Sequence, residues 1–128
     1  MATIPGTDMT IELQNNERVA VFKSADGYFA SQHPKQASKP CVVITDQRFI
    51  ACAQQGLLKK RLEEVASWSL SSFTGRLNTS QGAALGSFMH VLTLFTNDGE
   101  TASIGFKSER DRDSFKQAVV QALARYFS

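Results

Sequence analysis

Long hydrophobic runs are missing from this 128-residue sequence. Apolar segments such as residues 42–44 last only a few residues, whereas a membrane-spanning helix needs about 20. The N-terminal stretch MATIPGTDMTIELQNNE has neither the charged start nor the apolar centre of a secretory signal. We therefore expect a cytoplasmic protein, with peripheral attachment to the inner face of the membrane as the alternative.

Cysteine, histidine and excess charge are also scarce. The two histidines, His33 and His90, lie far apart in the sequence. The two cysteines, Cys41 and Cys52, lack the Cys-x-x-Cys spacing of a zinc knuckle, so we expect no metal site. The 14 basic and 12 acidic residues leave a net charge of +2, which is too low for a general nucleic-acid binder.

The motifs of common catalytic centres are absent as well. The sequence contains no Gly-x-Ser-x-Gly, and no Lys-Ser/Thr follows the glycines of GAALG at 82–86. Asp46 and Arg48 form an acid–base pair, but catalysis would need a third partner and a pocket, and the sequence indicates neither. We expect no enzymatic activity and no cofactor. Asp46 is interpreted as a turn residue, with Arg48 as its partly solvated partner.

What the sequence does contain is a series of alternating apolar residues, which predicts strands. We predict seven of them, at residues 18–30 with a turn or bulge at 25–27, and at 41–45, 48–52, 57–65, 66–73, 88–96 and 100–106. Residues 31–40 and 74–87 are expected to be loops, and NDG at 97–99 is a strong hairpin signal. Trp68 is expected in the core, with Ser67 and Ser69 on the opposite face of the strand.

The most specific prediction concerns the hairpin at residues 41–52. If Asp46 and Gln47 are its central turn residues, the cross-strand pairs are Ile44–Phe49, Val43–Ile50, Val42–Ala51 and Cys41–Cys52. Such apolar pairs are typical of a buried hairpin. A Cys41–Cys52 disulfide is conceivable in this register. The alternative is a pair of reduced, buried thiols, which is the usual state of cysteines in the cytosol.

The period changes to helical at the C-terminus. Phe115, Val119, Ala122, Leu123 and Tyr126 share one face at helical spacing, and Ser108 followed by Asp111 has the spacing of an N-terminal cap. Residues 1–16 are expected to form a loose arm with a short helical or extended turn around residues 9–13, and residues 17–128 the domain. Seven antiparallel strands and one amphipathic helix favour a mainly β (α+β) fold, a partly open barrel or two-sheet sandwich with the helix closing one end.

Three segments, in this order, resemble those of bacterial pleckstrin-homology-like domains. They are VVITDQRFI at 42–50, KKRLEEVASWSL at 59–70 and LTLFTNDGETASIGFKSERDRDSFKQAVVQAL at 92–123. The resemblance covers roughly residues 17–127. It implies a seven-stranded, partly open barrel capped by a C-terminal helix. It also implies a binding or assembly module without catalytic activity.

The densest basic cluster is Lys59, Lys60 and Arg61, and Lys35 and Lys39 in the proline-containing loop extend it. These residues are candidates for binding a lipid headgroup or an acidic partner. The alternative is a solvated edge strand whose lysines discourage edge-to-edge pairing. The closely spaced basic residues of phosphoinositide-binding pleckstrin domains are not evident around the first hairpin.

The function expected from these observations is that of a non-catalytic interaction module. We expect it to act through protein–protein contacts, above all by self-assembly into a homo-oligomer. Peripheral binding of anionic membrane lipids through the basic cluster is the alternative. The sequence does not identify the partner.

Overall fold

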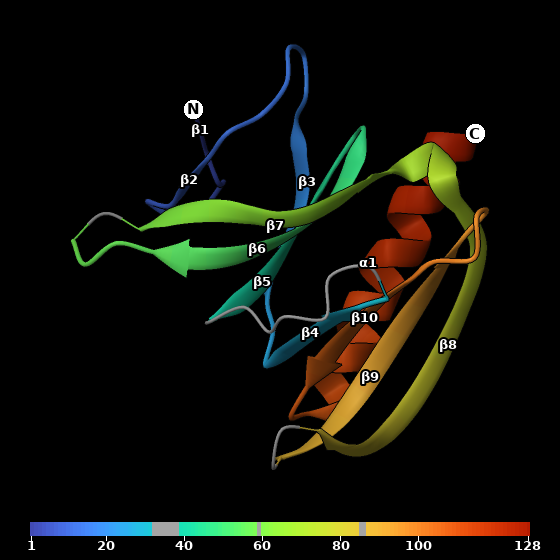
Figure 1. The fold of residues 1–128 in the computed structure, drawn as a ribbon. Helices are drawn as coiled ribbons and strands as arrows, with labels where there is room; N and C mark the ends of the chain where they lie inside the picture. The colour runs from blue at the N-terminus through green and yellow to red at the C-terminus, as the bar shows by residue number, and fades with distance from the viewer. Residues whose placement is uncertain (32–38, 59, 85–86) are drawn as a thin grey trace.

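The computed structural model describes residues 1–31, 39–58, 60–84 and 87–128, and in these residues the chain folds into two β-sheets and one long helix (Figure 1). The first sheet has the order β1 (Ala2–Thr3), β2 (Thr10–Ile11), β7 (Arg61–Ser69), β6 (Arg48–Gln55), β5 (Pro40–Thr45), β3 (Val19–Ser24). The second has the order β4 (Gly27–Ala30), β10 (Thr101–Phe106), β9 (Ser87–Thr96), β8 (Phe73–Ala84). A 3₁₀ turn, η1 (Leu70–Ser72), joins the sheets, and α1 (Glu109–Phe127) follows β10.

The main core lies between the two sheets and α1. Phe49 of β6 is at its centre, in edge-to-face contact with Trp68, Phe73 and Phe115. Phe115, Val119 and Leu123 are the buried residues of α1, and the Ser108 side chain accepts a hydrogen bond from the Asp111 N–H at 3.3 Å. The predicted helix, its cap and the core position of Trp68 are therefore confirmed, while Tyr126 at the end of the helical stripe is 39% exposed.

The predicted hairpin register is also confirmed. β5 and β6 pair with Ile44 opposite Phe49, and the remaining pairs follow as far as Cys41 opposite Cys52. Both cysteines are buried and free. The neighbouring Cys41 thiol and burial together raise the pKa of Cys52, which keeps this thiol protonated and unreactive.

A second, smaller core covers the other face of the first sheet. It contains Ile4 and Ile11 from the N-terminal segment, packed with Cys41, Val43, Ile50, Cys52 and Leu62. Every residue of β5 is buried, because one face of the strand meets each core. The expectation of a loose arm at residues 1–16 was wrong, since Ile4 is fully buried and β2 pairs with β7. The domain boundary at residue 17 stays a prediction.

A β-bulge at Val65 decides which core receives Leu62. Ala51 pairs with Ala66, but its neighbour Cys52 pairs with Glu64, so Val65 is the extra residue of β7. The bulge places Leu62 on the face of Cys52, in the smaller core. The division between the predicted strands 57–65 and 66–73 was wrong, because residues 61–69 form the single strand β7, and Glu63 and Glu64 lie within it.

The loop predicted at residues 74–87 was wrong too, because most of it belongs to β8. This segment consists of small, polar and glycine residues and shows no clear apolar alternation. It is a strand because its backbone pairs with β9. Gly75, at φ +86°, lies in the irregular stretch between Phe73 and Leu77. Seven strands still form the barrel if β3 and β4, which bend from one sheet to the other, count as one.

Candidate functional site

The most unusual surface is the end of the β6–β7 hairpin, which we call the β6–β7 tip and define as residues 56–58, 60 and 61. Leu57 is 99% exposed and Leu58 is 95% exposed. β6 ends at Gln55, and Gly56 turns the chain at φ +101°, so both leucines lie beyond the sheet with no core to contact. Two adjacent, fully exposed leucines are unfavourable in water, and such exposure is typical of a contact surface.

Basic residues surround the two leucines. Lys60 and Arg61 are exposed in the β6–β7 tip, and the Lys60 carbonyl accepts a hydrogen bond from the Thr10 N–H at 3.3 Å. Lys39, also exposed, lies at the same end of the first sheet, because its carbonyl accepts from the Gln54 N–H at 3.3 Å. Within the described part of the chain, none of these three cations forms an ion pair. Lys35 and Lys59, the other predicted site residues, lie outside the described residues.

The leucines were missed at the sequence level because residues 57–65 were interpreted as a strand. The structure begins β7 only at Arg61. A signal was present: LL stands directly after Gly56 and directly before KKR, between two polar segments. A glycine followed by two apolar residues and a basic run, without strand alternation, also fits the turn at the end of a hairpin.

The acid–base pair in the β5–β6 turn belongs to a different structure, an ion cluster. Arg48 does not bind Asp46: its guanidinium donates two hydrogen bonds of 2.9 Å to the Glu17 carboxylate and one of 2.9 Å to Glu64. Asp46 instead accepts from the Arg18 N–H at 3.0 Å. The turn itself is held by Thr45, whose hydroxyl oxygen accepts from the N–H groups of Gln47 and Arg48. The assignment of Arg48 as the partner of Asp46 was therefore wrong.

Glu17 is the buried member of this cluster, with a side chain 0% exposed. Burial by itself raises the pKa of Glu17, but the hydrogen bonds from Arg48, Thr45 and the Gln14 N–H outweigh it, so the pKa lies below its ordinary value of 4.5. The cluster connects the start of β3, the β5–β6 turn and β7, which gives it a structural role.

The lowered pKa of Glu17 predicts an acid-sensitive fold. Because the folded state holds the proton of Glu17 less tightly than the unfolded state, this residue stabilises the fold fully above pH 4.5, and the contribution is lost as the pH falls through the lower, folded-state pKa. We expect the urea midpoint of the wild type to fall below pH 4.5 more steeply than that of Glu17→Gln. Equal pH dependence of the two proteins would contradict the assignment.

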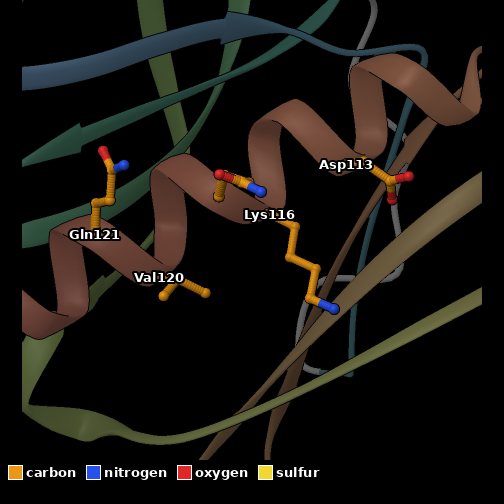
Figure 2. Close-up of a pocket in the computed structure, with 5 residues that line it drawn as sticks. Asp113, Lys116, Val120 and Gln121 are labelled. Carbon is orange, nitrogen blue, oxygen red and sulfur yellow. The ribbon is translucent and has the colours of Figure 1, made fainter.

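A hollow with a volume of about 580 Å³ lies along α1 (Figure 2). Asp113, Lys116, Gln117, Val120 and Gln121 line it. In Figure 2, Lys116 and Val120 project downward from the helix, whereas Gln121 projects upward. In the described residues no group of three His, Cys, Asp or Glu side chains is placed to hold a metal ion. Nor does any helix described here have the length and apolar character needed to cross a membrane.

Comparison with known proteins identifies the fold through solved structures alone. No protein-family model and no curated protein matches the sequence. Among solved structures, a pleckstrin homology domain from Shewanella amazonensis matches with a TM-score of 0.57 and 14% identity, covering 88% of each chain. Vav1, in a structure with an allosteric inhibitor that blocks its GEF activity, matches with a TM-score of 0.66 and 14% identity. That match covers 90% of this chain but only 30% of the Vav1 chain. The two sheets, the barrel strands and the closing helix therefore form a pleckstrin-homology-like fold.

Proposed function

We propose that this chain is a non-catalytic interaction module that binds the surface of anionic membranes through the β6–β7 tip. The observation that carries the proposal is the pair of fully exposed leucines, Leu57 and Leu58, next to Lys60 and Arg61, two cations that form no ion pair with any described residue. Lys39 at the same end of the sheet adds to the local positive charge. A fold of this kind supports a binding role in general, and the tip supports a membrane as the partner.

The leucines and the basic residues stabilise membrane binding by different interactions. Burial of a leucine side chain in the apolar boundary of a bilayer stabilises binding by about 1.5–3 kcal/mol, and each basic residue near an anionic surface adds about 1 kcal/mol. The leucines lie at the end of a hairpin whose strands are held in the sheet, so insertion needs no rearrangement of the core. The net charge of only +2 makes the local arrangement, and not the overall field, the source of attraction.

The test is sedimentation with vesicles of phosphatidylcholine alone and of phosphatidylcholine with phosphatidylserine. We expect binding to the anionic vesicles at low salt and weaker binding at 0.5 M salt, because salt screens the lysine and arginine charges but not the leucine contact. No sedimentation with anionic vesicles at low salt would refute the proposal. Equal binding to both vesicle types would reject the role of the basic residues.

Self-assembly is the second candidate function, and the open edge of β8 favours it. β8 is an edge strand of the second sheet, with Phe73–Ala84 paired only to β9 among the described strands. An edge of this length is able to pair with another strand. Light scattering of the vesicle-free protein over a wide concentration range is the measurement, and a monomer throughout would count against a homo-oligomer.

A further inference from the structure

A second edge in the molecule is open along most of its length. β2 pairs in parallel with β7 only at Arg61 and Leu62, whereas β7 continues to Ser69 (Figure 1). In the described residues no strand and no backbone hydrogen bond occupies the outer edge of β7 from residue 63 onward. The free stretch has seven residues, which at about 3.3 Å for each residue is long enough to pair with an extended segment of similar length.

The chemistry of this edge is acidic. Glu12, Glu63 and Glu64 line a hollow of about 430 Å³ that begins where β2 ends, together with Met1, Ile11, Arg61 and Leu62. At the far end, the Glu100 carboxylate accepts a hydrogen bond from the Trp68 indole N–H at 3.3 Å.

The nearest cations neutralise Glu64 of this edge but not Glu63. Arg48 is bound to Glu17 and Glu64 together, and Arg61 lies where β2 already pairs. Glu63 and Glu12 are exposed, and neither forms an ion pair in the described part of the chain.

We propose that the outer edge of β7, residues 63–69, binds an extended basic segment of a partner protein, which adds to the first sheet as a strand in line with β2. Main-chain hydrogen bonds to the free edge hold such a segment, and side chains select it. Glu63 pairs with Ala53 and Glu64 with Cys52, so the two carboxylates project from opposite faces of β7. Two successive basic residues of the incoming strand therefore lie beside one carboxylate each, Glu63 on one face and, on the other, Glu64, which already pairs with Arg48. The carboxylates left to select a basic segment are Glu63 and its neighbour in the hollow, Glu12.

The C-terminal part of the edge contributes little to the selection of the bound segment. Ala66, Ser67 and Ser69 have small side chains, so they select little at the positions beyond the basic pair. A second copy of this chain is the poorer occupant, because its own β7 edge carries the same acidic residues. The edge, residues 63–69, shares no residue with the β6–β7 tip, although Arg61 of the tip also lines the hollow, and peptide binding and vesicle binding are measured as separate results.

The test uses the full chain and a seven-residue peptide with an adjacent Lys-Arg pair followed by alternating Thr and Val. Trp68, the single tryptophan, lies in β7 and reports binding by its fluorescence. Hydrogen exchange at the amides of residues 63–69 reports strand pairing. We expect saturable binding with slower exchange at these amides. A version of the peptide with N-methyl groups on alternate backbone nitrogens is expected not to bind, because it cannot pair with the edge.

Variants of the protein test the charge. Glu12→Lys with Glu63→Lys is expected to weaken binding of the peptide by about tenfold, as expected for the loss and reversal of two exposed charge contacts. Glu109→Lys, the same change at an exposed position on α1, is the matched control and is expected to leave binding unchanged. Equal binding of the N-methylated peptide, or slower exchange only outside residues 63–69, would overturn the proposal. Protection of this edge without peptide, increasing with protein concentration, would also overturn it, because a second copy would then be the occupant.

Discussion

Replacement of Leu57 and Leu58 together by serine is expected to weaken binding to anionic vesicles by at least about 100-fold. Both side chains are almost fully exposed in the free protein, so they make no contribution to the core. Each leucine loses about 1.5–3 kcal/mol of burial in the membrane when it becomes serine, and each 1.4 kcal/mol corresponds to a tenfold change in affinity. The measurement is the vesicle concentration at which half of the protein sediments.

The matched control for this prediction is Phe127→Ser. Phe127 is also an exposed apolar residue, at 58%, but it lies at the C-terminal end of α1, away from the β6–β7 tip (Figure 1). We expect this variant to bind vesicles like the wild type. If the leucine variant bound equally well, or if the control lost as much affinity, the tip would not be the membrane contact. Thermal unfolding of both variants should match that of the wild type.

Replacement of Arg48 by alanine is expected to lower the free energy of unfolding by about 3 kcal/mol at neutral pH. The Glu17 side chain is 0% exposed and is held by a two-point contact with Arg48, so removal of the guanidinium leaves a buried carboxylate without its counter-charge. The loss of the third contact, to the half-exposed Glu64, adds little because that pair is screened by water. Urea unfolding measures the change.

Two further variants separate the ion pair from other effects of the substitution. Glu17→Gln combined with Arg48→Met removes both charges and is expected to recover most of the stability, because no buried charge then remains. Arg61→Ala removes an exposed arginine that has no ion partner among the described residues and is expected to change the stability by less than about 0.5 kcal/mol. An Arg48→Ala variant as stable as Arg61→Ala would show that the cluster contributes nothing.

The parts of the fold predicted correctly are those in which local pattern and tertiary role agree. The β5–β6 hairpin was predicted in its observed register because apolar residues on both sides of a polar turn define only one apolar pairing. The helix was predicted with its cap because Ser108, Asp111 and the stripe of Phe115, Val119 and Leu123 follow one helical period. Each of these signals lies within a short segment of chain.

The errors came from segments whose structure depends on distant partners. β8 has no clear apolar alternation, and it is a strand because it pairs with β9. The bulge at Val65 moves Leu62 from one face to the other, and the alternation of β7 does not reveal it. Leu57 and Leu58 were assigned to a strand, since exposure is a property of the complete fold and not of the residue type.

The sequence by itself determined the class of fold, the central hairpin and the closing helix, because their hydrophobic periods dictate which faces are buried. It also indicated Lys60 and Arg61 as candidate binding residues. Only the tertiary structure decided that the N-terminal segment covers a second core, that Arg48 binds Glu17, and that two leucines lie exposed beside the cations. The physical reason is that burial, ion pairing and exposure depend on which distant segments the fold brings together, and a local pattern contains no record of them.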